Sequence, residues 1–262
     1  MSAIRESRTI VDGLPMRWLE SGSGWPVVLL HAFPLSADMW RPQLAAVPEG
    51  YRFIAPDLCT RPGEGIDGYA RCAGALLDRL EIDTAAIGGL SMGGYVTFAL
   101  YRLLSRRFSQ LILADTRPQA DTDDGRAGRQ ALRRLLAEAG ATAVADVMLP
   151  RLLSERARRE QPDVVTVVRT LIEAQPAPVL DAAIVAMMER PDSTPDLAHI
   201  AVPVLLIAGE HDEVTPPDVA QEMERAIPRA RAAVIPEAGH LSNLERPGVF
   251  SRALHDFLLA NI

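Results

Sequence analysis

The sequence predicts an α/β fold, in which a mainly parallel eight-stranded sheet has helices on both faces and an inserted helical cap. Three observations support this prediction. Short apolar runs alternate with helical patterns through most of the chain, as strands and crossover helices do in a parallel sheet. Runs such as 26–31 are continuously apolar, which is typical of strands buried on both faces. Between about residues 117 and 195 the alternation stops, and only helical patterns remain.

The chain begins with two β-like runs on either side of Asp12-Gly13, a hairpin turn signal, so we expect an antiparallel edge there. Ser36 can cap the helical segment that follows the third strand. The expected strands are residues 7–11, 16–20, 26–31, 51–56, 85–89, 111–114, 202–208 and 232–235. The expected helices are residues 69–80, 92–104, a segment after Pro216-Pro217, and 241–259.

One core with one insertion is the predicted organisation. A chain of 262 residues is long for a single domain, but α/β folds of this length commonly form one. Residues 1–116 and 196–262 are expected to form the core, and residues 117–195 the helical cap. The cap is rich in Ala, Leu and Arg. It is broken by five prolines, at positions 150, 162, 176, 178 and 191.

Composition and charge argue against several classes of function. Apolar residues make up 48% of the chain and charged residues 23%, an ordinary globular composition. The 27 basic and 34 acidic residues give a net charge of −7, which offers no overall attraction to nucleic acid or anionic lipid. The N-terminal segment has no apolar signal region, and no stretch approaches the roughly 18 apolar residues of a membrane span. We therefore expect a cytoplasmic protein without nucleic-acid or membrane partners; nothing in the sequence indicates an oligomeric state.

Cys59 and Cys72 are the only cysteines. They form no CxxC motif and have no nearby histidine, so they predict neither a metal site nor a thiol-based catalytic group. A chain of this length has enough core to fold without a disulfide, and we expect two reduced thiols. The sequence indicates no metal and no organic cofactor.

The segment Gly89-Leu-Ser-Met-Gly93 is a G-x-S-x-G motif. An apolar strand leads into it and an apolar helix leads out, which is the strand–turn–helix context of a nucleophile elbow. Small residues around Ser91 would let strand and helix approach closely while the serine takes a strained conformation. The alternative interpretation is a glycine-rich turn in which Ser91 only caps the helix. We predict that Ser91 is a nucleophile.

A serine hydroxyl needs a neighbouring base to take its proton. Of five histidines, His240 has the most suitable position, after the expected strand 232–235 and before the last helix. That position lies at the carboxyl edge of the sheet, where such folds bind ligands. The alternative for His240 is a loop histidine that only bonds the backbone. The other four histidines are expected in turns, near strands or in helix packing, at positions 31, 199, 211 and 255.

The third member of such a site is an acid that accepts the histidine Nδ1–H, fixes its tautomer and stabilises the imidazolium. Asp115 and Asp212 both follow expected strands. Asp212 is favoured, because it gives the order Ser, acid, His that is typical of folds with a nucleophile elbow. The oxyanion needs two backbone N–H donors that are already in place. We predict Met92, the residue after the nucleophile, and Phe33, in the loop after the strand ending at residue 31.

Four segments resemble those of the α/β-hydrolase superfamily: His31-Ala-Phe-Pro-Leu35, Gly89-Leu-Ser-Met-Gly-Gly94, Gly209-Glu-His-Asp212 with Thr215-Pro-Pro217, and Ala238-Gly-His240 with Glu245-Arg-Pro247. Within it, the chain is similar to 3-oxoadipate enol-lactonase-like hydrolases, aryl esterases and cofactor-free haloperoxidases or perhydrolases. The resemblance implies the triad Ser91, Asp212 and His240, with Phe33 and Met92 as oxyanion donors. Two segments depart from it. Ala32 stands where members usually have glycine, and residues 59–65 differ from an Arg-Gly-x-Gly-x-Ser-like loop at the site entrance.

The expected reaction is acyl transfer to water, with a small-molecule ester or lactone as substrate and an acyl-enzyme as intermediate. The same residues could cleave a C–C bond in a diketone or use hydrogen peroxide in place of water. A non-catalytic ligand receptor on the same scaffold is an alternative of another class. The Met, Leu and Ala content of the cap favours a small or medium apolar acyl or aryl group.

Overall fold

The computed structural model describes residues 3–61 and 63–261. Within them an eight-stranded sheet has the order β1-β2-β4-β3-β5-β6-β7-β8. The strands are β1 Arg5–Val11, β2 Leu14–Gly22, β3 Trp25–Leu30, β4 Tyr51–Pro56, β5 Ala85–Leu90, β6 Phe108–Ala114, β7 Val204–Gly209 and β8 Ala230–Ile235. Strand β2 is antiparallel to β1 and to β4, whereas the other pairs are parallel. The predicted mainly parallel sheet with an antiparallel edge is confirmed.

The antiparallel edge forms where the turn signal predicted it. Strands β1 and β2 pair from Arg5 opposite Glu20 to Val11 opposite Leu14. The turn between them consists of Asp12 and Gly13, whose φ angles are 49° and 75°. Aspartate and glycine tolerate this left-handed conformation, which the tight hairpin turn requires.

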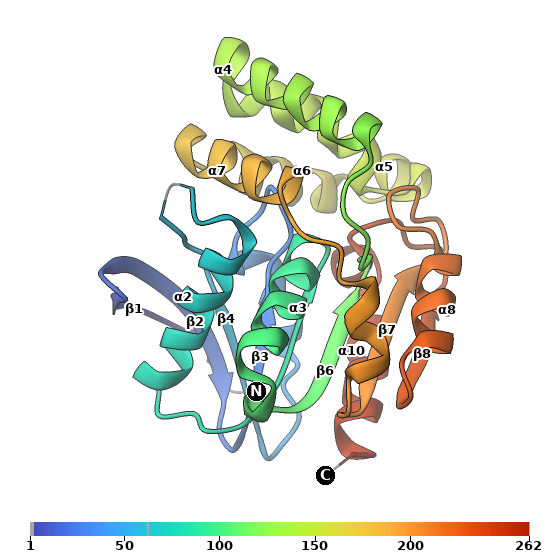
Figure 1. Cartoon of the computed structure of the whole chain (residues 1–262). Coiled ribbons are helices and arrows are strands. Elements are labelled where there is room, and N and C mark those ends of the chain that lie inside the picture. Colours follow the sequence, from blue (N-terminus) through green and yellow to red (C-terminus); the bar gives the residue numbers. More distant parts are fainter. Residues whose placement is uncertain (1–2, 62, 262) are drawn as a thin grey trace.

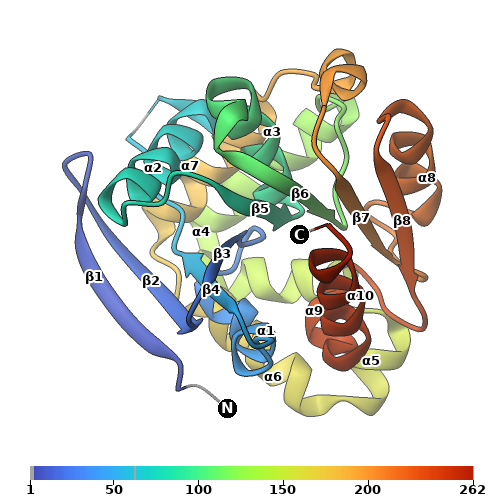
Figure 2. The same cartoon turned by 90° about the horizontal axis from the view of Figure 1, so that it is seen from below.

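Helices cover both faces of the sheet. Figure 2 shows three helices on one face, α2 Gly65–Arg79, α3 Met92–Leu104 and α8 Pro217–Ala226. It shows three on the other face, α1 Arg41–Ala45, α9 Ser242–Glu245 and α10 Pro247–Leu259. Trp40, Phe53, Phe250 and Phe257 are among the largest fully buried side chains of the core. The other two described helices that lie before residue 117 or after residue 199 are η1 Ala37–Trp40 and η2 Ser105–Arg107.

The closing helix is broken, which the sequence analysis did not predict. In place of one helix over residues 241–259, α9 ends at Glu245 and α10 begins at Pro247. Arg246 between them has φ −134° and ψ 57°, which is not helical. Pro247 cannot donate the hydrogen bond that would continue α9, whereas its fixed φ suits the first position of a new helix.

Four helices lie over the carboxyl edge of the sheet, and we name them the α4–α7 layer (Figure 1). They are α4 Asp123–Leu152, α5 Glu155–Glu160, α6 Pro162–Glu173 and α7 Ala177–Met188, followed by η3 Thr194–His199. The four helices α4 to α7 lie within the predicted insertion, whose boundaries at residues 117 and 195 remain a prediction, whereas η3 extends past residue 195. Gly140, with φ 75° and ψ −172°, kinks α4. Within the described residues no single helix is long and apolar enough to cross a membrane; α6 and α7 reach the threshold only as a pair bent by 95°.

The prediction of two free thiols is wrong, because the structure joins Cys59 and Cys72 in a disulfide. The loop after β4 folds back against α2 and brings the two Cα atoms to 6.4 Å, within the range that a disulfide spans. A spacing of 13 residues does not reveal this tertiary contact. Disulfides persist mainly in oxidising compartments, so the cysteines no longer support a cytoplasmic location. Pro62, in the same loop, lies outside the described residues, as do Met1, Ser2 and Ile262 at the ends of the predicted core ranges.

Candidate active site

The predicted site residues lie in loops that follow parallel strands, below the α4–α7 layer (Figure 1). Because parallel strands end at the same edge of a sheet, these loops converge there. The loops follow β3, β5, β6, β7 and β8 and carry His31, Ser91, Asp115, Asp212 and His240, respectively.

Ser91 occupies the tight turn between β5 and α3, with φ 54° and ψ −113°. For a residue other than glycine this is a strained conformation. The close approach of the turn to β3 explains the flanking glycines. A Cβ on Gly93 would lie 2.2 Å from the carbonyl oxygen of Leu30, and one on Gly89 would lie 2.3 Å from the carbonyl carbon of Gly93. The motif therefore forms a strand–turn–helix elbow with Ser91 at its tip.

The structure brings Ser91, His240 and Asp212 into one series of hydrogen bonds. The Nε2 atom of His240 lies 2.9 Å from Ser91 Oγ, and its Nδ1 atom lies 2.8 Å from Asp212 Oδ2. Nδ1–H donates to the carboxylate, which leaves Nε2 free to accept the serine proton. His240 and Asp212 are only 2% and 3% exposed, so water does not compete for these bonds.

Asp212 is held as a carboxylate by four donors. Its Oδ1 atom accepts from the N–H groups of Val214 and Thr215 at 2.8 and 3.0 Å. Its Oδ2 atom accepts from His240 and from Thr215 Oγ1, the latter at 2.6 Å. Burial alone would raise the pKa of Asp212, but the positive charge of His240 and these hydrogen bonds outweigh burial and keep the pKa below its ordinary value.

The role of Thr215 was not predicted from the sequence. The turn itself could have been predicted, because an aspartate side chain commonly accepts from the backbone N–H two residues on, as Asp212 does from Val214.

Asp115, the competing acid, is also buried but does not contact His240. Its Oδ1 atom accepts from Gly209 N at 2.8 Å, and its other oxygen accepts from Ser242 Oγ. Burial raises the pKa of Asp115 well above its ordinary value, and the negative charge of Asp212 adds to the effect. Of the two aspartates, the structure brings Asp212 to the histidine.

The two predicted oxyanion donors lie beside Ser91. Met92 directly follows it at the start of α3, and Phe33 lines the same cavity as Ser91. Within residues 3–61 and 63–261 no protein acceptor occupies the backbone N–H of Phe33 or Met92. Both groups are therefore available to a negatively charged oxygen.

His31 holds the loop that carries Phe33. Its Nδ1 atom lies 3.0 Å from the carbonyl oxygen of Ala32, and its Nε2 atom accepts from the backbone N–H of Leu58 at 2.9 Å. Burial lowers the pKa of His31, which favours the neutral form that can accept this bond. The expectation that His31 shapes a turn fits these contacts.

A cavity of about 660 Å³ opens beside Ser91 and His240. Its wall comes largely from α4 and includes Leu132, Leu135 and Met148. The wall also carries charged side chains: Arg117, Arg129, Arg151 and Arg190, with Asp121, Asp124 and Glu213. It is therefore more polar than the Met, Leu and Ala content of the cap suggests.

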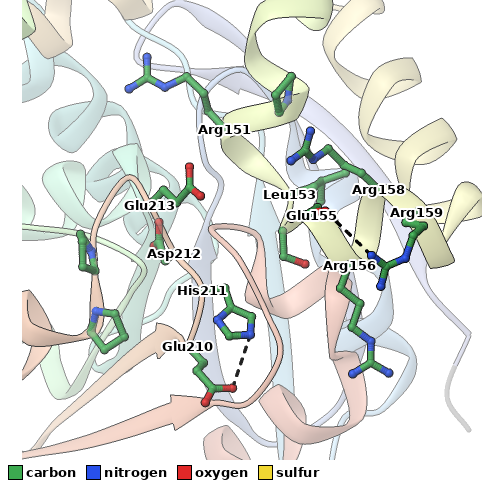
Figure 3. A pocket seen from close by; sticks show the side chains of 14 residues that line it. Arg151, Leu153, Glu155, Arg156, Arg158, Arg159, Glu210, His211, Asp212 and Glu213 are labelled. Carbon is green, nitrogen blue, oxygen red and sulfur yellow. Dashed lines mark ion pairs between the residues drawn. The ribbon is translucent and has the colours of Figure 1, made fainter.

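A second pocket, of about 620 Å³, adjoins Asp212 on its outer side (Figure 3). It is lined mainly by charged side chains of both signs, some of which form ion pairs on its wall, such as Arg159 with Glu155 on α5. Arg151 and Glu213 line both pockets. Neither Ser91 nor His240 lines the second pocket, so the cavity beside them is the candidate reaction site.

Comparison with known proteins agrees with this geometry. Residues 27–253 match the family described as the alpha/beta hydrolase family. The 3-oxoadipate enol-lactonase 2 of Acinetobacter baylyi is 30% identical over 238 residues, which cover 87% of this chain and 86% of that protein.

Solved structures give the same result. A thermophilic esterase from Thermogutta terrifontis is 32% identical, with a TM-score of 0.92 over 98% of each chain. The enol-lactonase from Burkholderia xenovorans is 26% identical, with a TM-score of 0.89 over 97% of this chain and 100% of that one. The chain belongs to the alpha/beta hydrolase family.

Proposed function

We propose that the protein hydrolyses small-molecule carboxylic esters or lactones through an acyl-enzyme on Ser91. The observation that carries this proposal is the hydrogen-bonded series from Ser91 Oγ through His240 to Asp212, with distances of 2.9 and 2.8 Å. The esterase and the enol-lactonases among its relatives support the same class of reaction.

In the acylation step, His240 Nε2 takes the proton of Ser91 as its Oγ attacks the substrate carbonyl. The N–H groups of Phe33 and Met92 stabilise the oxygen that becomes negative. Asp212 stabilises the imidazolium, which then protonates the leaving oxygen. With an ester the alcohol departs, whereas with a lactone the leaving oxygen stays attached to the acyl group.

In the deacylation step, His240 takes a proton from a water molecule, and the resulting hydroxide attacks the acyl-enzyme. His240 then returns the proton to Ser91 Oγ, and the carboxylic acid is released. Every step uses groups of the protein and water. The α4–α7 layer serves as the cap, because it supplies most of the wall of the Ser91 cavity.

A substrate panel tests this proposal. It contains aryl esters of graded acyl length, several lactones and one diketone, and a parallel assay supplies hydrogen peroxide with an ester. We expect turnover on at least one ester or lactone and none with Ser91→Ala. Cleavage of the diketone alone, or turnover that needs peroxide, would assign the site to one of the alternative reactions.

A further inference from the structure

We propose that Glu245 is a positioning residue for His240 and that it ties the loop of the histidine to the junction between α4 and α5. This role presupposes the proposed function of His240 as the base. Glu245, in α9, is 3% exposed and does not line the Ser91 cavity. It would therefore act through the histidine loop and not through the substrate.

The carboxylate of Glu245 bridges two segments that are far apart in the sequence. On one side, its Oε1 atom accepts from the backbone N–H of Gly239 at 3.0 Å. On the other side, Oε2 accepts from Ser154 Oγ at 2.6 Å, and the Ser154 N–H lies 3.3 and 3.4 Å from the two oxygens. Ser154 lies between α4 and α5, and its side chain also caps α5 by accepting from Ala157 N.

A second contact ties the other side of the histidine to the same segment. The backbone N–H of Leu241 donates to the carbonyl oxygen of Leu152 at 3.1 Å. The backbone N–H groups of the residues directly before and after His240 are therefore both bonded to residues 152–154, the first through Glu245 and the second directly. The backbones of Gly239 and Ser154 also pack closely, since a Cβ on Gly239 would lie 2.6 Å from Ser154 N. Figure 3 shows the surroundings of this junction from the outer pocket, with Leu153 and Arg156 facing Glu210 and His211.

The chemistry of these contacts requires the carboxylate form of Glu245. All of its partners here are N–H or O–H donors, which a protonated carboxyl could not satisfy fully. No cation pairs with it among the described residues, and burial raises the pKa of Glu245 above its ordinary value. Hydrogen bonds from Gly239 and Ser154 offset part of the cost of burying this charge. Glutamine could bond one segment through its oxygen but would present N–H groups to the other.

Positioning of this kind matters because proton transfer depends on the place of the imidazole. A misplacement of about 1 Å at a reacting group can reduce the rate by about a hundredfold. For Glu245→Gln we expect kcat to fall by about tenfold to a hundredfold. KM should stay close to the parent value, because Glu245 does not touch the cavity.

Glu237→Gln is the matched control. Glu237 lies on the same histidine loop and forms ion pairs with Arg156 of α5 and with Arg246, but its side chain is 47% exposed. If any electrostatic contact between the loop and the α4–α7 layer were enough to position His240, kcat would fall by the same factor in both glutamine variants. We expect Glu237→Gln to keep kcat and KM near the parent values.

The experiment measures kcat and KM on one aryl ester and the rate at which a fluorophosphonate probe labels Ser91. Labelling needs an activated serine but no particular substrate, so a parent protein that neither labels nor turns over would contradict the proposed function itself. If the parent labels and folded Glu245→Gln labels and turns over as fast, the role of Glu245 is disproved. Equal losses in Glu237→Gln would disprove it as well.

Ser154→Ala provides an independent variant in case Glu245→Gln does not fold. It removes the 2.6 Å bond to Glu245 and should lower kcat by a smaller factor, with KM retained. In the double variant the two losses should be less than additive, because both break the same link. Fully additive losses, or a Ser154→Ala variant with unchanged kcat, would contradict the link.

Discussion

Strands β6 and β7 lie side by side in the sheet, and each is followed by a buried aspartate in a different setting. Asp115 and Asp212 are 1% and 3% exposed. Asp212 faces the imidazole of His240, whereas Asp115 bonds a backbone N–H of Gly209 and the hydroxyl of Ser242. The pKa of Asp115 is raised, because burial dominates there. At Asp212 the charge of His240 and the surrounding donors overcome burial, and the pKa is lowered.

The difference shows that burial alone does not decide what a carboxylate does. At Asp212 the imidazole and three further donors favour the carboxylate that the proposed function needs to orient His240, whereas the partners of Asp115 make it a link between β6, β7 and the start of α9. Asp115 fixes the scaffold next to the site, and Asp212 belongs to the hydrogen-bonded series that ends at Ser91.

The largest loss of activity is expected when Ser91, the residue at the end of this hydrogen-bonded series, is replaced. Ser91→Ala should lower kcat on esters by about a million-fold while the fold remains intact, because no other group takes over the attack. Steady-state assays on an aryl ester, with circular dichroism to check folding, measure this. Activity within tenfold of the parent would mean that the nucleophile lies elsewhere. The roles assigned to Asp115 and Asp212 would then no longer follow from their distance to Ser91 and His240.

The next effect separates the two aspartates directly. Asp212→Asn favours the wrong imidazole tautomer and should lower activity at neutral pH by about ten-thousand-fold. Asp115→Asn keeps an acceptor for Gly209 and a donor for Ser242, so it should lose far less. Both variants and the parent are assayed from pH 5 to 10 on one aryl ester. If Asp115→Asn lost most of its activity and Asp212→Asn stayed close to the parent, Asp115 would be the acid in place of Asp212.

The same two substitutions should change the pH dependence of the melting temperature in opposite directions. The raised pKa of Asp115 makes the parent lose stability as pH rises from the unfolded value, about 3.9, through the folded one. Asn does not titrate, so the melting temperature of Asp115→Asn should rise relative to the parent between pH 4 and 8. The lowered pKa of Asp212 contributes stability that is present above the unfolded value and lost as pH falls through the folded one.

For Asp212→Asn, the deficit in melting temperature should therefore be greatest near neutral pH and shrink in acid. Calorimetric melting scans of the three proteins at matched pH values test both signs. Parallel melting curves at all pH values would mean that neither aspartate titrates differently in the folded and unfolded states.

The smallest expected effect on activity concerns the disulfide, which lies away from both strand ends. Thiol counting on protein unfolded without reductant should find no free thiol, because the structure pairs Cys59 with Cys72. Reduction should leave kcat unchanged, since neither sulfur contacts the site. Two free thiols would instead restore the prediction made from the sequence.

The sheet and the three hydrogen-bonded residues could be predicted because their signals are local. Apolar runs identify parallel strands, and polar residues directly after them lie at the carboxyl edge. The disulfide and the Glu245 contacts could not be predicted, since they depend on how the loop after β4 folds onto α2 and on which part of α4 meets residues 237–241. The break at Pro247 was visible in the sequence, but the apolar pattern of 241–259 continued across it.

Ser91 and His240 are 149 positions apart in the sequence, which affects how activity arises as the chain folds. Ser91 directly follows the central strand β5, whereas His240 follows β8, the edge strand that pairs only with β7. A chain leaving the ribosome presents the serine first, and its hydroxyl has no base until β8 has docked. In a refolding experiment, activity on an aryl ester would therefore appear only in molecules in which β8 and the loop after it have docked. Activity on an ester therefore indicates that the edge strand β8 has joined the sheet.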